Sequence, residues 1–338
     1  MTTKPDHNIE TKKPPILYKD TQEVIQTIQQ QINGDFLSYW ISDNSQLVQD
    51  DVLVLYKILN GKIKNQTLYL FVKSDGGSGK GALRIVHLLR NFYKNIVALV
   101  PLDCASAATM LVLGADVIQM GPLAYLSAID TSITHDLSPI DTKFNDKVSV
   151  SQNELDRVLR LWDDKKESAD LNPYRDLYKF IHPLVFGSVD RASSLSIKLT
   201  TEILSYHLED TDRADKISNH LNSEYPSHSY PITIREAKRI GLNVEKLDVP
   251  LNNLLLQLNE LYSEMAQNAQ TDYDQVNHHD NGILKIIEMP GNQMFYQKEK
   301  DWHYLAEERR YISLNEESSW RTVIEKDGEI DVKKFYIG

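Results

Sequence analysis

The chain has 338 residues and a single cysteine, Cys104. One thiol cannot form a disulfide within the chain, and such cysteine usage is typical of proteins kept in a reducing compartment. We therefore expect a cytoplasmic protein. With 41% apolar residues, the chain is long enough to bury a large core without crosslinks. Cys104 itself is expected to be a small buried apolar residue.

Long apolar runs are also missing. A membrane-spanning helix requires about 20 consecutive apolar residues. The longest candidate, residues 95–126, is interrupted by Asp103 and Asp116. Residues 1–13 are polar and lack the apolar segment of a secretory signal. The sequence therefore predicts neither a transmembrane segment nor a signal peptide.

Basic clusters and metal-ligand patterns are scarce. The formal net charge is −11 and no long basic block occurs, which is unusual for a protein that binds nucleic acid. His278, His279 and Asp280 are adjacent, but no further set with metal-ligand spacing accompanies them. We expect no nucleic-acid partner, no metal and no cofactor.

The glycine-rich run 76–81 contains a lysine, yet it does not fit the Walker pattern of phosphate-binding loops. That pattern requires glycine six residues before the lysine and serine or threonine directly after it. Here Ser74 and Gly81 stand at those positions. The run is better explained as a turn whose glycines let a substrate carbonyl approach the backbone closely.

Hydrophobic spacing predicts an α/β fold. The expected elements are a strand over 68–73, a helix over 82–93, a strand over 96–100, a helix over 107–113 and a strand over 117–120. This order predicts parallel strands joined by right-handed crossovers. Beyond Asp130 the pattern becomes mainly helical, with helices over 188–208 and 251–265. The leucine-rich second helix is expected to pack in the core or to form an oligomer contact.

Composition divides the chain into four parts. Residues 1–20 are a polar tail that we expect to be flexible. Residues 21–266 are expected to form the α/β domain, and residues 267–282 a polar linker. Residues 283–338 are rich in Ile, Tyr and Val and carry turn signals, which predicts a small β-rich C-terminal extension.

Two turns in the α/β segment could form a reaction centre. Ser106 lies between a predicted strand and a predicted helix, and so does Ser74-Asp75-Gly76-Gly77 upstream. A serine at this position is often only a helix cap. Its hydroxyl could also act as a nucleophile, while the helix start and the glycine loop present backbone N–H groups to an oxyanion. The two turns together indicate acyl-transfer chemistry.

These residues resemble the serine dehydrogenase proteinase family, in the clan that also contains the Clp protease proteolytic subunit, signal peptide peptidase A and the crotonases. The resemblance covers residues 20–260. Ser74-Asp75-Gly76-Gly77 stands where the clan has Ser-Pro-Gly-Gly, with Asp75 in place of the proline. Residues 105–116, 120–122 and 127–130 match the nucleophile turn and the segments after it. Residues 182–184, 228–232 and 236–242 match the C-terminal half of the family.

The resemblance implies a Clp/crotonase-like fold, which is a ββα superhelix with a mostly parallel sheet. It implies a serine peptidase that acts on peptides or proteins and assembles as a homo-oligomer. Ser106 would be the nucleophile, and Gly76, Gly77 and Ala107 would form the oxyanion hole. The histidine and aspartate of the Clp-type pattern fall near Asp130 and His228, with the residue types exchanged. Our first hypothesis is therefore a triad of Ser106, His228 and Asp130, since triads are defined by geometry and not by chain order.

The identity of the general base stays open at this point. Relatives of signal peptide peptidase use a Ser-Lys dyad, and Lys147 lies 41 residues after Ser106, with Lys143 nearby. His135 is a third candidate. A chain with no competent base is the last alternative.

Two other functions also stay open. The first is a crotonase-type acyl-CoA enzyme, in which Ser106 would be incidental. The absence of a basic patch near Gly76 for the CoA phosphates counts against it, although Lys80 and Arg84 are present. The second is a non-catalytic scaffold that keeps the fold and binds a partner through residues 283–338.

Overall fold

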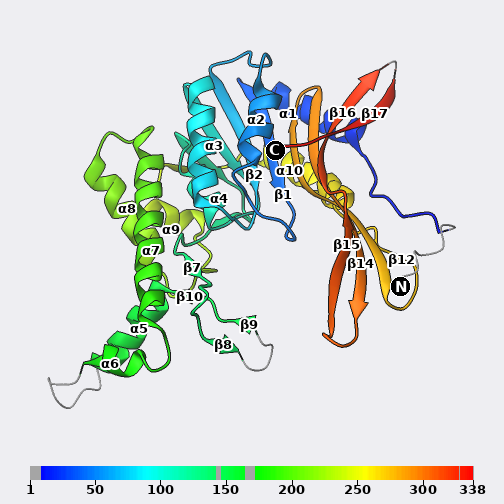
Figure 1. Ribbon diagram of the computed structural model, residues 1–338. Helices are drawn as coiled ribbons and strands as arrows, with labels where there is room; N and C mark the ends of the chain where they lie inside the picture. Colours follow the sequence, from blue (N-terminus) through cyan, green and yellow to red (C-terminus); the bar gives the residue numbers. More distant parts are fainter. Residues whose placement is uncertain (1–8, 142–145, 164–171, 327, 338) are drawn as a thin grey trace.

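The structure, a computed structural model, describes residues 9–141, 146–163, 172–326 and 328–337. Within these residues one sheet of eleven strands crosses the molecule, with the main order β11-β5-β3-β2-β1-β13-β14-β16-β17 (Figure 1). Its first half is parallel and consists of β1 (Asp35–Ile41), β2 (Thr67–Lys73), β3 (Asn95–Val100), β5 (Val117–Met120) and β11 (Val244–Lys246). The strands predicted over residues 68–120 and the mixed α/β class are confirmed.

Helices cover both faces of this parallel half. One face carries α2 (Asp51–Leu59), α3 (Gly79–Phe92) and α4 (Ala107–Val112), and the other carries α1 (Tyr18–Gln31) and α10 (Val249–Met265). Strand β1 shows why both faces are covered, because all seven of its residues are buried. Leu37 and Tyr39 pack on the α3 side, whereas Phe36 and Trp40 pack on the α10 side.

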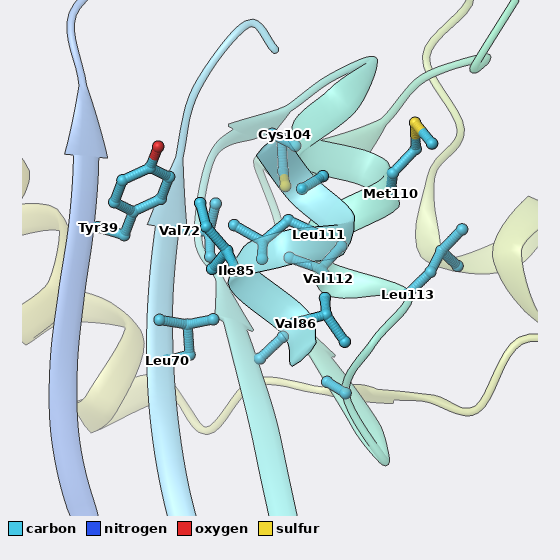
Figure 2. Close-up of a cluster of buried hydrophobic side chains, with 14 of the residues drawn as sticks. Tyr39, Leu70, Val72, Ile85, Val86, Cys104, Met110, Leu111, Val112 and Leu113 are labelled. Carbon is cyan, nitrogen blue, oxygen red and sulfur yellow. The ribbon is translucent and has the colours of Figure 1, made fainter. Parts of the chain in front are cut away.

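The core between the sheet and α3–α4 supports the two predicted turns. Figure 2 shows strand side chains such as Tyr39, Leu70 and Val72 gathered with Leu111 and Val112 of α4. Each of these five residues is at most 2% exposed. The predicted role of Cys104 is confirmed, since it lies fully buried in the same cluster and burial raises the pKa of its thiol well above the usual value.

The C-terminal strands continue the same sheet in antiparallel order. They are β12 (Thr271–Asp272), β13 (Asn277–Met289), β14 (Asn292–Leu305), β15 (Arg310–Glu316), β16 (Ser319–Lys326) and β17 (Glu329–Phe335). β13 pairs with β1 at the edge of the parallel half. It begins at Asn277, so this one strand includes residues on both sides of position 283, where the C-terminal extension was predicted to begin. A buried ion pair joins the two halves, since Lys285 Nζ lies 2.9 Å from Asp51 Oδ1 of α2.

The third region is mainly helical and extends away from the sheet (Figure 1). It contains α5 (Gln152–Asp163), α6 (Pro173–Leu177), α7 (Pro183–Ser205), α8 (Thr211–Ser223) and α9 (Ile234–Arg239). Two short strand pairs accompany the helices, β7 (Ser132–Ile133) with β10 (Val150–Ser151) and β8 (Ile140–Asp141) with β9 (Asp146–Lys147). None of the helices in the described ranges has the length and apolar character that crossing a membrane requires.

Candidate active site

Ser106 lies in a strained turn between β4 (Asp103–Cys104) and α4. Its backbone adopts φ 54° and ψ −119°, in the positive-φ half of the Ramachandran map that L-residues rarely occupy. Such a conformation costs on the order of 1–3 kcal/mol and is typical of functional positions. Ser106 occupies the N-cap position of α4, yet its side chain makes no capping hydrogen bond. The hydroxyl is therefore not consumed by the helix.

A chain of buried hydroxyl groups holds this turn. The backbone N–H of Ser106 donates to Ser127 Oγ at 2.7 Å, and the backbone N–H of Ser127 donates to Thr109 Oγ1 at 3.0 Å. Thr109 Oγ1 in turn donates to the carbonyl of Cys104 at 2.8 Å. The supporting roles of Thr109 and Ser127 were not predicted, because their contacts join two turns that are distant in sequence.

The glycine loop lies directly against Ser106. Gly76 and Gly77 have φ values of 113° and 138°, which favour glycine strongly. A Cβ at Gly76 would come within 2.6 Å of Ser106 Cβ and 3.0 Å of Ala107 N. The loop is held from the other side by Leu47, whose N–H donates to the Gly76 carbonyl and whose carbonyl accepts from Ser78 N–H, both at 2.8 Å. Only glycine at position 76 allows this close approach.

The backbone N–H groups around Ser106 differ in whether they already have a hydrogen-bond acceptor. The N–H of Gly76 donates to Ser74 Oγ at 3.0 Å, so it is already used. Within the described ranges, the N–H groups of Gly77 and Ala107 have no protein acceptor. Ala107 is buried and follows Ser106 directly, while Gly77 is exposed and lines the same cavities as Ser106, so these two N–H groups are the donors available to an anionic oxygen there.

Asp130 and His228 form a hydrogen-bonded pair. His228 Nδ1 lies 2.8 Å from Asp130 Oδ1, which leaves Nε2 as the nitrogen that can serve a substrate or a serine. Paired backbone hydrogen bonds between Leu126 and Ile232, at 3.0 and 2.8 Å, hold the two segments together. The triad hypothesis from the sequence paired these two residues, and the structure places their side chains in contact.

The environment of this pair favours a charged imidazole. The Asp130 side chain is 12% exposed and the His228 side chain 50% exposed. The hydrogen bond that His228 Nδ1–H donates to Asp130 raises the pKa of His228 above its usual value, and partial burial opposes this effect without reversing it. Asp130 therefore stabilises the imidazolium that forms when His228 accepts a proton.

Two cavities meet at Ser106. The first, which we call the His228 cavity, has a volume of ≈ 580 Å³ and is lined by Asp43, Asp75, Gly76, Gly77, Ser106, Asp130 and His228, among others. The second, which we call the α4–α7 cavity, has a volume of ≈ 390 Å³ and is lined by Gly77, Ser106, Ala107, Met110, Ile129 and several residues of α7. Ser106 and Gly77 thus lie where both cavities open.

The His228 cavity carries negative charge, which Lys73 partly compensates. Lys73 is 8% exposed, forms an ion pair with Asp43, and lies 3.6 Å from Asp103 Oδ2. Burial opposes its charge, but Asp43, Asp103 and Asp75 outweigh that effect and raise its pKa. Lys73 is therefore a cation and a poor proton acceptor. Partial burial and the Asp103 carboxylate raise the pKa of Asp75.

The alternative bases lie elsewhere. Lys147 on β9 is paired with Asp136 at 2.6 Å, and His135 Nδ1 accepts a hydrogen bond from Leu137 N–H at 3.0 Å. Neither residue lines the His228 cavity or the α4–α7 cavity. Lys143 lies outside the described residues. Among the residues that are described, no group of three or more His, Cys, Asp or Glu side chains is arranged to hold a metal ion.

Comparisons with known proteins give a distant structural similarity. The sequence matches no protein-family model and no curated protein. A serine mutant of the "1510-N membrane-bound stomatin-specific protease" is 13% identical, with 70% of this chain and 88% of that chain covered and a TM-score of 0.39. A lysine mutant of the same protease, in complex with a substrate peptide, is 14% identical, with 67% and 80% covered and a TM-score of 0.38.

Proposed function

We propose that this chain is a serine peptidase of the Clp/crotonase-like fold, with Ser106 as nucleophile and the His228–Asp130 pair as its proton acceptor. One observation carries the proposal. A serine with strained backbone and an uncapped hydroxyl lines the same cavity as a histidine already hydrogen-bonded to a buried carboxylate. This is the set of groups that acyl transfer by a serine requires.

The proposed reaction has two steps. Ser106 Oγ attacks the scissile carbonyl carbon while His228 Nε2 takes its proton, and the His228 imidazolium then protonates the departing amine as the C–N bond breaks. A water molecule, activated by the same histidine, hydrolyses the resulting ester and regenerates Ser106. Catalytic hydrogen bonds are often completed only in the substrate complex. The proposal therefore requires that His228 reaches Ser106 Oγ when substrate is bound, since no hydrogen bond joins the two among the described contacts.

The oxyanion of each tetrahedral intermediate would be bound by the N–H groups of Gly77 and Ala107. Losing one such donor typically costs about 10²–10³ in rate. Gly76 has a different role in this proposal. Its own N–H is engaged by Ser74, so it contributes the space that brings the loop against Ser106. The substrate class is a peptide or protein, and the assembly implied by the resemblance is a homo-oligomer.

The decisive test is covalent labelling of the full chain with a fluorophosphonate probe, read by mass spectrometry. We expect labelling of the native protein at Ser106 and its loss in Ser106→Ala. Ser205→Ala is the matched control, because Ser205 is an exposed serine on α7 whose hydroxyl donates to the carbonyl of Glu202. Unlabelled protein that is folded by circular dichroism would reject the peptidase. CoA affinity in that protein would favour the acyl-CoA alternative, and its absence the scaffold.

A further inference from the structure

The His228 cavity has a polar lining. Each of its lining residues in the described part of the chain is either glycine or carries a polar side chain, and the acidic ones are Asp43, Asp75 and Asp130. Cavities that bind small molecules are usually lined mainly by apolar groups. A cavity of ≈ 580 Å³ without an aliphatic or aromatic wall therefore favours a polar or charged group.

Proton transfer determines which part of a substrate enters this cavity. His228 lines it, and the departing amine must receive its proton from His228. The nitrogen of that amine belongs to the residue directly after the scissile bond. The side chain of this residue must therefore lie on the same side of Ser106 as the His228 cavity.

Asp75 is the carboxylate of the lining that lacks a partner. Asp130 is hydrogen-bonded to His228, and Asp43 forms an ion pair with Lys73. Asp75 is exposed and has neither a hydrogen bond nor an ion pair with its side chain within the described ranges. Its carboxylate is therefore available to a substrate.

The charges around Asp75 make a cation the favoured ligand. Lys73 is the ammonium group among the carboxylates of Asp43, Asp103 and Asp75, so this group of four carries a net negative charge. Lys73 is 8% exposed and does not line the cavity, which leaves the carboxylates on the accessible side. Partial burial and the Asp103 carboxylate raise the pKa of Asp75, because its negative charge is not fully compensated. A cation beside Asp75 would be attracted.

The position of Asp75 suits the residue directly after the scissile bond. Asp75 precedes Gly76, at which a Cβ would lie 2.6 Å from Ser106 Cβ. Neighbouring Cα atoms are about 3.8 Å apart, so the loop holds Asp75 close to the nucleophile. The long stems of lysine and arginine span such distances. Because the clan has proline at this position, the carboxylate is a feature of this chain.

We infer that the His228 cavity selects a lysine or arginine directly after the scissile bond, and that Asp75 is the specificity-determining residue. This inference rests on the proposed function, because it uses proton transfer by His228. The substrate class becomes a peptide or protein with a basic residue on the leaving side. The attraction of a cation, set against the similar repulsion of an anion, corresponds to a preference on the order of 10-fold.

Transfer of the acyl group to added amines tests the leaving side directly, because an amine that attacks the Ser106 ester must occupy that side. The full chain is acylated with a peptide p-nitrophenyl ester, and argininamide, leucinamide or glutamic acid α-amide competes with water. The new C–N bond forms as the C–O bond to Ser106 breaks, and the amine proton passes through His228 to Ser106 Oγ. Mass spectrometry gives the ratio of amide to acid. We expect argininamide to exceed glutamic acid α-amide on the order of 10-fold.

Two substitutions of Asp75 identify the responsible group. Asp75→Asn should remove the preference, and Asp75→Lys should reverse it. The product ratio does not depend on how fast the ester forms, so a slow variant is still informative. Asp212→Asn is the matched control, because Asp212 is an exposed carboxylate of α8 that lines neither cavity. In the native chain, raising the salt concentration from about 0.05 to 0.5 M should weaken the preference.

The outcomes separate the two proposals. Transfer without catalysis is measured with Ser106→Ala and subtracted. Equal ratios for the two charged amines, or an arginine preference that Asp75→Asn leaves intact, overturns the role of Asp75 while the peptidase stands. If neither Asp75 variant folds, an arginine preference that salt does not weaken overturns it. A native chain that the fluorophosphonate probe does not label rejects the peptidase, and this inference with it.

Discussion

At the scale of single residues, Asp130 determines what His228 can do. Its carboxylate is largely buried and its hydrogen bond reaches only Nδ1, so it fixes the ring and stabilises the imidazolium. The pKa of His228 is raised by this contact. A raised pKa makes His228 a stronger proton acceptor, but it also means that the acceptor form is populated only at higher pH.

The reactivity of Ser106 should therefore rise with pH. The rate of fluorophosphonate labelling is expected to increase as His228 loses its proton, with a midpoint above the ordinary histidine pKa of about 6.5. Asp130→Asn should move this midpoint to lower pH, because the raising interaction is lost. It should also lower the plateau rate by as much as about 10⁴. Labelling rates measured between pH 5 and 9 give both quantities.

Asp136→Asn provides the control for this experiment. Asp136 is exposed and paired with Lys147, and it lines neither cavity. Its substitution should leave the midpoint unchanged. A midpoint that Asp130→Asn does not move would show that His228 is not the group whose titration limits the reaction.

At the scale of elements, the site depends on the fit between two turns. The loop after β2 and the turn before α4 meet at Gly76 and Ser106, where there is no room for an additional methyl group. We expect Gly76→Ala to lower the labelling rate by at least about 10², because the loop that carries the Gly77 N–H must move away. Thermal unfolding of the same variant should occur at lower temperature.

Gly61→Ala is the control that separates the loss of contact space at position 76 from the strain of an alanine at positive φ. Gly61 also has a positive φ, of 73°, but a Cβ there would meet no atom within 4 Å. It should cost about 1–2 kcal/mol of stability and leave labelling unchanged. Equal labelling rates for the two variants would mean that contact with Ser106 is not what requires glycine at position 76.

The sequence allowed much of this architecture to be predicted, for local reasons. Strands 68–73, 96–100 and 117–120 are short buried runs bounded by turns, and the helices between them show regular apolar spacing. A capping box, Ser151 with Glu154, is a signal of the same local kind, and Ser151 N–H donates to Glu154 Oε2 at 2.9 Å. Each of these signals lies within a few neighbouring residues.

The features that could not be predicted depend on distant partners. Nothing near Ser127 in the sequence indicates that its hydroxyl holds the backbone of Ser106. Lys285 resembles an exposed strand residue in the sequence, yet it is 4% exposed and pairs with Asp51. Such pairs become visible only when the chain is folded.

At the scale of the whole molecule, a buried carboxyl group joins four elements. Glu288 of β13 is fully buried and accepts hydrogen bonds from Thr21 and Gln22 of α1, Tyr262 of α10 and Gln293 of β14. Burial raises its pKa to about 7, although the four donors oppose that shift. This group therefore links the stability of the entire fold to pH.

Its contribution to stability should fall as pH rises. Because the folded-state pKa lies above the unfolded value of 4.5, the folded protein binds more protons between about pH 4.5 and 7, and stability decreases across that interval. The loss amounts to about 3 kcal/mol and is complete above pH 7. Urea unfolding of native protein and Glu288→Gln between pH 4.5 and 8 should give a difference curve with this slope.

Glu264→Gln, at an exposed position of α10, is the matched control for the loss of one carboxylate. A flat difference curve for Glu288→Gln would show that Glu288 titrates alike in the folded and unfolded chains.

The pairing of β1 with β13 also determines how long β1 remains without this partner strand during synthesis. Tyr39 pairs with Ile287, so β1 leaves the ribosome about 250 residues before the strand that covers its edge. At about 5–20 residues per second, that interval lasts on the order of 10–50 s. Throughout it, a strand whose residues all become buried presents an open edge. The nascent chain carries both turns of the candidate site long before the fold is closed around them, and a ribosome that stalls before residue 277 leaves that edge exposed to other chains.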